Sequence, residues 1–153
     1  MPNTYTQLYI QLVFAVRFRE ALVNESLREP LQKYLTGIAT QHGHKMLAVY
    51  CMPDHTHVFV GLNPVQSISQ LANALKANSS RWINSENFCR VRFQWQQGYG
   101  AFSYHKELIP VVARYIINQK EHHRQRSFRK EYLEFLKEFD IAFDDQYLFD
   151  FFE

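Results

Sequence analysis

Two histidines, His55 and His57, stand two residues apart at the start of an apolar, β-branched run. If this run forms a strand, successive side chains alternate between its faces, so both imidazoles point to the same side. Thr56, Val58 and Val60 then point to the other side, towards a core. Two imidazoles on one face of a rigid strand make half of a metal site, since imidazole is a common ligand of divalent metal ions.

A second pair of residues could complete this site. Tyr115 and Gln119 are four residues apart, so on a helix they lie on one face, one turn from each other. A glutamine oxygen is a hard ligand, and with two imidazoles it suits an octahedral ion such as Mg²⁺ or Mn²⁺. Such an ion polarises a phosphoryl oxygen, and a phenol nearby is a candidate nucleophile. The two motifs together predict metal-dependent attack on a phosphate group.

The elements that must position these residues follow from the periodicity of the sequence. Alternating apolar residues predict three strands, over residues 6–16, 44–52 and 55–62, with Pro53 and Asp54 forming the turn of a hairpin. Helical spacing of apolar residues predicts four helices, over about 27–42, 67–82, 109–126 and 128–139. Residues 67–70 have the form of a capping box.

Residues 90–103 have a different character, because aromatic residues are interleaved with arginines and glutamines and interrupted by Gly98 and Gly100. We interpret them as two short strands joined by a glycine loop. Aromatic and basic residues in this arrangement can stack on nucleic-acid bases and neutralise phosphates. The competing interpretation is an edge hairpin whose aromatic side chains lie in the core, where large aromatics usually are.

The order of elements is strand, helix, strand, strand, helix, short strands, helix, helix. It predicts an α+β fold: a ferredoxin-like or RRM-like antiparallel sheet with helices packed on it, plus C-terminal helices that carry Tyr115. We expect one domain over residues 1–153, with about 128–153 as an acidic helical extension, because no repeat, linker or low-complexity tract divides the chain. Such a fold by itself hosts many functions.

The composition excludes several classes of protein. Hydrophobic residues make up 46% and aromatic residues 16%, so the chain is globular rather than disordered. No apolar run approaches the ~20 residues of a membrane span, and no signal peptide is recognisable at Met1. Two cysteines without CxxC spacing indicate a reducing cytosol and neither a disulfide framework nor a cysteine zinc site.

The net charge of +2 is divided unevenly along the chain. Residues 130–153 hold eight acidic and two basic residues, a net of −6, so residues 1–129 carry +8. A basic body suits a polyanion such as nucleic acid, although an ordinary surface imbalance is the alternative. The candidate phosphate contacts are Lys76, Arg81, Arg90, Arg92, Arg114 and Lys120, followed by Arg124 and Arg126.

The two motifs in this order resemble those of the HUH single-tyrosine transposases. Met52 to His57 carries the histidine pair, and Tyr115 to Gln119 follows about sixty residues later. Residues 95–103 and 118–123 also look like this family, and the resemblance covers nearly the whole chain. The family comprises transposases of the smallest bacterial insertion sequences, of the 200/605 type, and of REP-associated elements.

This resemblance implies a single HUH transposase domain with a defined mechanism. His55 and His57 would be the HUH histidines, and Gln119 the third protein ligand of Mg²⁺ or Mn²⁺. Tyr115 would attack a phosphate in single-stranded DNA, keep a 5′-phosphotyrosine link and release a 3′-hydroxyl. A second strand's 3′-hydroxyl would reverse the step and join DNA. The covalent link keeps the phosphodiester energy, so no ATP, nucleotide cofactor or ligase is expected.

The resemblance also implies partners. Family members act as homodimers and recognise hairpins near the ends of their elements. The expected partners are therefore single-stranded DNA with hairpins and a second copy of the chain, without a membrane. In several family members the tyrosine helix of one subunit completes the site of the other. The expected location is the bacterial cytoplasm, with the protein associated with the nucleoid when bound to DNA.

One position departs from the family pattern. The residue between the two histidines is usually bulky and apolar, whereas here it is Thr56. Threonine is β-branched and suits a strand, but it buries less apolar surface, and its hydroxyl needs a partner if it is buried. We therefore expect Thr56 to affect how rigidly the site is held, and not which residues bind the metal.

Alternative assignments remain open for several residues. Tyr104 and Tyr132 are the alternative nucleophiles. His122 shares the face of Tyr115 and Gln119 and could touch metal or DNA, or be a solvated helix residue. The remaining histidines are interpreted as structural or surface residues: His42, His44, His105 and His123.

The competing function is a non-catalytic ferredoxin-like module that binds single-stranded nucleic acid through its aromatic residues. Only the transposase requires His55, His57, Gln119 and Tyr115 together, so a covalent protein–DNA adduct separates the two functions.

Overall fold

A four-stranded antiparallel sheet forms the centre of the molecule, with the strand order β2-β3-β1-β4. The computed structural model describes residues 3–17 and 22–151, so residues 152 and 153 of the predicted acidic extension lie outside the described residues. The strands are β1 (Tyr9–Ala15), β2 (Lys45–Cys51), β3 (His55–Gly61) and β4 (Gly100–Tyr104). The predicted α+β fold and the β2–β3 hairpin are confirmed.

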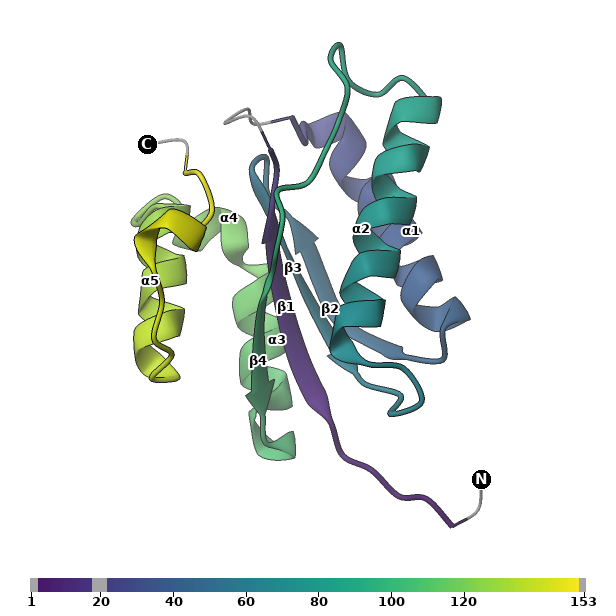
Figure 1. Ribbon diagram of the computed structural model, residues 1–153, viewed down its shortest axis with the longest axis vertical. Helices are drawn as coiled ribbons and strands as arrows, with labels where there is room; N and C mark the ends of the chain where they lie inside the picture. The colour runs from purple at the N-terminus through teal and green to yellow at the C-terminus, as the bar shows by residue number, and fades with distance from the viewer. Residues whose placement is uncertain (1–2, 18–21, 152–153) are drawn as a thin grey trace.

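Helices cover both faces of this sheet, with α1 and α2 on one side and α3, α4 and α5 on the other (Figure 1). Their bounds are α1 (Glu25–Gln41), α2 (Ile68–Ser85), α3 (Ile109–Ile117), α4 (Gln119–His122) and α5 (Phe128–Glu138). Two short 3₁₀ turns, Lys106–Leu108 and Asp145–Tyr147, complete the elements. The predicted capping box at Ser67 and Gln70 is present. No helix within the described ranges is long and apolar enough to cross a membrane.

The single helix predicted over residues 109–126 is wrong, because the chain bends at Asn118. This residue has φ −93° and ψ 23°, away from the helical ψ of about −42°. Asparagine tolerates this conformation, since its short polar side chain competes with regular helix bonding. The bend starts α4 in a new direction and turns the side chain of Gln119 inward, where it is fully buried.

The two strands predicted within residues 90–103 are reduced to one, β4. Trp95 makes only an isolated bridge to Val16, and Asn84 of α2 pairs with the backbone of Phe93 in both directions, at 2.7 and 3.0 Å. The indole of Trp95 donates to the Ser79 hydroxyl at 2.9 Å. Side chains of α2 therefore satisfy hydrogen-bonding groups of this segment, so the segment does not need a neighbouring strand to pair with.

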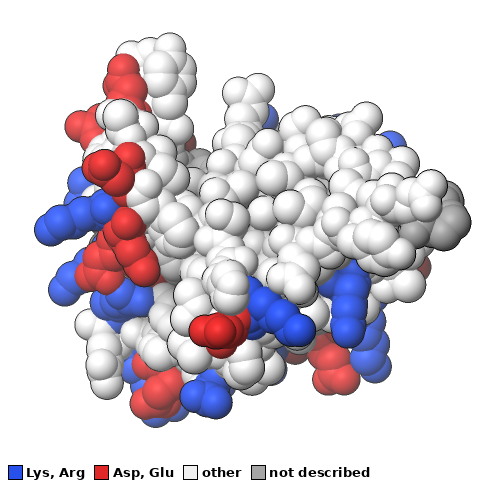
Figure 2. Space-filling view, turned by 90° about the horizontal axis from the view of Figure 1, so that it is seen from below, with Lys and Arg blue, Asp and Glu red and all other residues white. Residues whose placement is uncertain are grey.

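The C-terminal segment packs against the sheet. Tyr132 of α5 lies over Gly100, where an added Cβ would stand 2.7 Å from the tyrosine hydroxyl oxygen. Further along, the Gln96 amide exchanges two hydrogen bonds of 2.7 Å with the backbone of Asp150. Figure 2 shows charged side chains, many of them acidic, crowded on the side where α5 lies. The acidic charge of this segment is thus on its surface, while its inner face joins the core.

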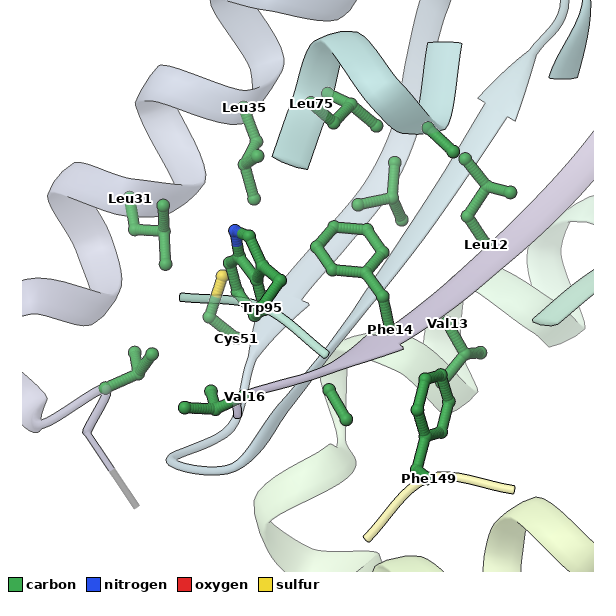
Figure 3. Packing of buried hydrophobic residues seen from close by; sticks show 14 of the residues in the cluster. Leu12, Val13, Phe14, Val16, Leu31, Leu35, Cys51, Leu75, Trp95 and Phe149 are labelled. Carbon is green, nitrogen blue, oxygen red and sulfur yellow. The ribbon is translucent and has the colours of Figure 1, made fainter. Parts of the chain in front are cut away.

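The main core lies between the sheet and the pair α1 and α2. Figure 3 shows Phe14 and Trp95 side by side, beneath Leu31 and Leu35 of α1 and Leu75 of α2. The rings of Phe14 and Trp95 meet edge to face, with centroids 4.7 Å apart. Large side chains buried on this face hold the central strands rigidly, and the opposite face of the same strands carries the candidate site.

Candidate metal and nucleophile site

Both motif histidines lie on β3, an inner strand of the sheet. His55 and His57 are buried, and their ring centroids are 5.1 Å apart on the face that α3, α4 and α5 cover. Thr56 and Val58 point into the opposite core, as the alternation predicts. The Thr56 hydroxyl is buried beside the Cys51 thiol of β2, so the departure from the family pattern places a polar group in the core.

The outer nitrogen of each imidazole is held by an acceptor. Nδ1 of His57 lies 2.7 Å from Oε1 of Gln11, and Nδ1 of His55 lies 2.7 Å from a carboxylate oxygen of Asp54. Since an amide oxygen and a carboxylate can only accept, both Nδ1 atoms donate, and both Nε2 atoms face inward. Metal-binding histidines are typically oriented by such an acceptor on the distal nitrogen.

Two residues from distant parts of the chain join the histidine pair. His123 follows α4 and Glu131 belongs to α5, and the ligand atoms of all four side chains lie within 4.8 Å of one another. Oε1 of Glu131 is 3.1 Å from Nε2 of His57, 3.2 Å from that of His123 and 3.6 Å from that of His55. We call His55, His57, His123 and Glu131 the four-donor cluster.

Sequence reasoning missed both added members of the four-donor cluster. His123 was interpreted as a structural or surface residue, yet only 10% of its side chain is exposed. Its spacing of four from Gln119 could have suggested a shared helix face. Glu131 lies three residues after Phe128 and four before Phe135, so it is an acid on the apolar face of an amphipathic helix. An acid at a core position is an anomaly that already points to a partner or a metal.

The structure brings Gln119 beside the cluster rather than directly against the motif pair. Its Oε1 atom lies 2.9 Å from Nε2 of His123, and its Nε2 atom donates to the Tyr115 carbonyl at 3.5 Å. Gln119 is buried, so its amide must use such partners. It contacts the cluster through His123.

Tyr115 presents its hydroxyl to the same cluster. The hydroxyl donates to Oε2 of Glu131 and accepts from the guanidinium of Arg126, while the ring stacks on His122 with centroids 4.4 Å apart. Burial, followed by the negative charge of Glu131, raises the pKa of Tyr115 above its usual value. A cavity of about 200 Å³, lined by Tyr115, Arg126 and Glu131 among others, opens beside the hydroxyl.

The alternative nucleophiles are placed elsewhere. The Tyr104 hydroxyl accepts from the Gln11 amide at 2.8 Å, and Tyr132 lies over Gly100. Within the described residues, the Tyr115 hydroxyl is the tyrosine oxygen that contacts a member of the four-donor cluster. His122, which the sequence left open, contacts the tyrosine ring rather than the cluster.

The buried charges of the cluster compensate one another. Burial alone would raise the pKa of Glu131, but His57, His123 and His55 outweigh it and hold that pKa well below its usual range. Burial alone would lower the pKa of His55, but the hydrogen bonds and charges of Asp54 and Glu131 raise it to about 9. Burial lowers the pKa of His57 despite the nearby carboxylate. A divalent cation bound here would take the place of the proton between His55 and Glu131.

The arginines and lysines predicted to contact phosphate are dispersed, with one exception. One cavity of about 480 Å³ beyond the end of α2 is lined by Arg81, Arg90 and Arg92.

The other predicted phosphate contacts lie apart from this cavity. Lys76 donates to the Gly98 carbonyl at 2.8 Å, and Lys120 lies 3.8 Å from a carboxylate oxygen of Glu25. Arg114 is exposed on α3, and Arg126 is drawn into the site instead of onto the outer surface.

Comparisons with known proteins give a consistent set of relatives. The chain is 32% identical over 75 residues to the ISDra2 transposase TnpA of Deinococcus radiodurans, a match covering 49% of this chain and 54% of that protein. A transposase crystal structure from Deinococcus radiodurans superposes with a TM-score of 0.61 and 25% identity, over 76% of this chain and 94% of the other. The chain thus spans about half the length of the curated relative that it matches.

A second solved structure, a REP-associated tyrosine transposase bound to a REP hairpin, shares the fold with a TM-score of 0.59. At 14% identity, over 79% of this chain and 72% of that one, it supports the fold alone. The family model described as "Transposase IS200 like" matches residues 4–119, which is more than half of the chain and includes His55, His57, Tyr115 and Gln119. This chain therefore belongs to the IS200-like transposase family.

Proposed function

We propose that this chain is a single-tyrosine transposase that cleaves and rejoins single-stranded DNA through a covalent 5′-phosphotyrosine intermediate. The observation that carries the proposal is the position of the Tyr115 hydroxyl, which contacts Glu131 at the edge of a buried cluster containing His55 and His57. Tyr115 and the two histidines come from segments far apart in the sequence and lie within the range matched by the family, whereas Glu131 lies beyond it. A nucleophile beside a divalent-metal site is the arrangement that phosphoryl transfer requires.

The chain's own residues supply most of the chemistry that the proposal requires. His55 and His57 would hold a divalent ion, for which the family resemblance implies Mg²⁺ or Mn²⁺ with Gln119 as the third protein ligand. The ion, when bound, polarises a non-bridging oxygen of the phosphate. Arg126 donates to the Tyr115 oxygen and favours its anionic form as the proton leaves. Glu131 orients the hydroxyl from the other side.

In the proposed reaction the Tyr115 oxygen forms a bond to phosphorus and the bond to the 3′-oxygen breaks. The phenol proton is lost to solvent and the departing 3′-oxygen takes up another. A 3′-hydroxyl from a second strand reverses the step and joins DNA, so phosphodiester energy is conserved without ATP. Within this chain the ring centroids of Tyr115 and His57 are 6.3 Å apart, which supports attack by the tyrosine of the same subunit.

The proposed partners are single-stranded DNA with hairpins and a second copy of the chain. The second copy is the partner that the family resemblance implies. A hairpin ligand accords with the REP hairpin bound by the structural relative.

The cavity lined by Arg81, Arg90 and Arg92 is the proposed DNA-binding surface. Hydrogen bonds at the end of β1 link the cavity to the histidine strand. The backbone N–H of Val16 donates to the Asp54 carbonyl, next to His55, and the backbone N–H of Arg17 donates to the Gln94 carbonyl, near Arg92, each at 2.9 Å. Figure 2, which views the opposite end of the molecule, shows a wide uncharged surface bordered by charged side chains of both signs. DNA held by Arg81, Arg90 and Arg92 would therefore lie at the end of the sheet where His55 begins β3.

Replacing Arg90 and Arg92 together with alanine is expected to weaken single-stranded DNA binding and to flatten its salt dependence. Each lost phosphate contact reduces the slope of log affinity against log salt by about 0.7 on single strands. Fluorescence anisotropy over a salt series measures both quantities. The exposed Lys33→Ala on α1 is the matched control and is expected to leave the slope unchanged. An unchanged slope in the arginine variant would place the DNA elsewhere.

A covalent-adduct assay tests the proposed function. The purified chain with Mn²⁺ should form a denaturation-resistant adduct with labelled single-stranded DNA that carries a hairpin, and none with the matched duplex. Mass spectrometry of the digested adduct should place the nucleotide on the peptide that contains Tyr115. Absence of an adduct with DNA from the gene's own flanking palindromes would favour the non-catalytic binding module.

One observation already weighs against that module. Of the aromatic residues that were expected to stack on bases, Phe93, Trp95 and Phe102 are buried in the core, and only Tyr99 reaches the surface. The interpretation that places these aromatics in the core is therefore confirmed. Base stacking by this segment cannot be the main source of DNA affinity.

A further inference from the structure

We propose that a cavity at the β2 edge of the sheet holds one unpaired nucleotide of the DNA strand, next to the phosphate that reacts at the histidines. The base would stack on Tyr50 and Arg28, and Lys120 would pair with a phosphate. We call this space the edge cavity; its volume is about 420 Å³, and its lining includes Asn24, Glu25, Arg28, Tyr50, Met52 and Lys120. The inference rests on the proposed function for the presence of single-stranded DNA and adds where one of its bases is bound.

The edge cavity lies beside the metal and nucleophile site. β2 is an outer strand of the sheet, and its Tyr50 is paired directly with His57 of β3. Side chains directly opposite each other in antiparallel strands lie on one face, with Cβ atoms about 4.5–5.5 Å apart. Lys120 follows Gln119 on α4, so it borders the same site from the helical side. A base over Tyr50 would therefore belong to a nucleotide adjoining the phosphate at the histidines.

The size and lining of the edge cavity suit a single nucleotide. Its volume lies within the range of about 300–1,000 Å³ that is typical of sites for small molecules. Tyr50 and Met52 are partly exposed and give it an apolar wall, whereas Lys120 stands exposed at its rim. A duplex keeps its bases paired inside the stack, so only an unpaired or extruded base can enter such a space.

Two planar side chains meet in the edge cavity. The central guanidinium carbon of Arg28 lies over the Tyr50 ring, 5.2 Å from the ring centroid. Tyr50 packs on the face that α3 covers, whereas Arg28 belongs to α1 on the other face, so the arginine reaches the ring around the open edge of β2. Aromatic rings and guanidinium planes are the surfaces on which proteins stack unpaired bases. Because every base has such a face, the edge cavity would hold a base with little regard to its identity.

Glu25 contacts both cations of the edge cavity. Its carboxylate lies 2.7 Å from the Arg28 guanidinium and 3.8 Å from the Lys120 ammonium. The side chains of Glu25 and Lys120 are 69% and 62% exposed, and ion pairs so open to water are weak and exchange easily. A phosphate oxygen is also an anionic acceptor and can take over such a contact. Replacing Glu25 should therefore strengthen DNA binding, whereas replacing either cation should weaken it.

Coupling between a missing base and a missing ring tests the proposal. The full chain is titrated, by fluorescence anisotropy, with hairpin-bearing single-stranded DNA from the gene's flanks and with versions that carry one abasic residue at successive unpaired positions. We expect one abasic position to weaken wild-type binding at least about fivefold. Tyr50→Leu should weaken binding to the intact DNA by a similar factor, and the same abasic residue should then cost nothing further. Independent effects at every position would overturn the proposal.

Tyr50→Phe is the conservative variant that controls for the integrity of β2. It keeps the ring, so it should bind the intact DNA as the wild type does and remain sensitive to the same abasic residue. A loss of affinity in Tyr50→Phe equal to that in Tyr50→Leu would mean that the ring does not stack on a base, and the proposal would be refuted.

Charge substitutions test the phosphate contact. Lys120→Gln should weaken binding and reduce the slope of log affinity against log salt by about 0.7. Glu25→Gln should strengthen binding at least about twofold. The matched control is Glu29→Gln, on the same helix, whose carboxylate pairs with Lys33 outside the edge cavity and which removes the same charge. Equal strengthening by both glutamate substitutions would show a general effect of charge and reject a phosphate in the edge cavity.

These measurements use binding alone, so they separate this proposal from the proposed function. Coupling between Tyr50 and one base, in a chain that forms no covalent adduct, would sustain the edge cavity and reject the transposase chemistry. An adduct formed by a chain in which the abasic residue and Tyr50→Leu act independently would sustain the chemistry and reject the edge cavity.

Discussion

Tyr115→Phe is expected to abolish the covalent protein–DNA adduct while leaving the affinity for single-stranded DNA unchanged. The substitution removes only the hydroxyl, which donates to Glu131 and accepts from Arg126. The ring keeps its stacking on His122, so α3 should stay in place. Removing a nucleophile that has no substitute lowers the rate at least about a thousandfold, which is below detection in a gel assay of the adduct.

The matched control for this experiment is Tyr132→Phe. This residue is also a largely buried tyrosine on the same side of the sheet, but its hydroxyl lies against Gly100 instead of the four-donor cluster. The variant should therefore form the adduct at the wild-type rate. Persistence of the adduct in Tyr115→Phe together with its loss in Tyr132→Phe would transfer the role of nucleophile to α5.

The part of the site that local periodicity determines could be predicted from the sequence. A strand alternates its side chains, so the shared face of His55 and His57 followed from their spacing alone. Tyr115 and Gln119 were likewise placed together by the helical repeat, and the Asn118 bend between them does not separate them. The β2–β3 hairpin followed from the turn residues between two apolar runs.

The rest of the site depends on packing between segments distant in the sequence, which periodicity does not report. Glu131 reaches the histidines only because α5 folds back across the sheet, and His123 only because the chain bends after Asn118. The role of the aromatics in residues 90–103 was left open for the same reason. These aromatics fit either base stacking or a core, and contacts with α2 placed them in the core.

Phe135→Ala is the substitution expected to show that α5 belongs to the domain core. The Phe135 ring stacks on Phe102 of β4 with centroids 5.0 Å apart, and lies 6.1 Å from Tyr115 and 6.2 Å from His57. Truncating a buried phenylalanine removes its burial and leaves a cavity, at a cost of about 3–5 kcal/mol in free energy of unfolding. Urea denaturation monitored by circular dichroism measures the change.

The exposed Lys137→Ala, on the same helix, should alter the stability by no more than about 0.5 kcal/mol. A cost below about 1 kcal/mol for Phe135→Ala would mean that α5 is an appendage whose contacts with the sheet contribute little. The larger cost would instead have a consequence for the site. Because Phe135 contacts the rings of both His57 and Tyr115, the packing that stabilises α5 also holds Glu131 between the histidines and the nucleophile. Stability and catalysis would then depend on one set of contacts, and substitutions in this helix should affect both together.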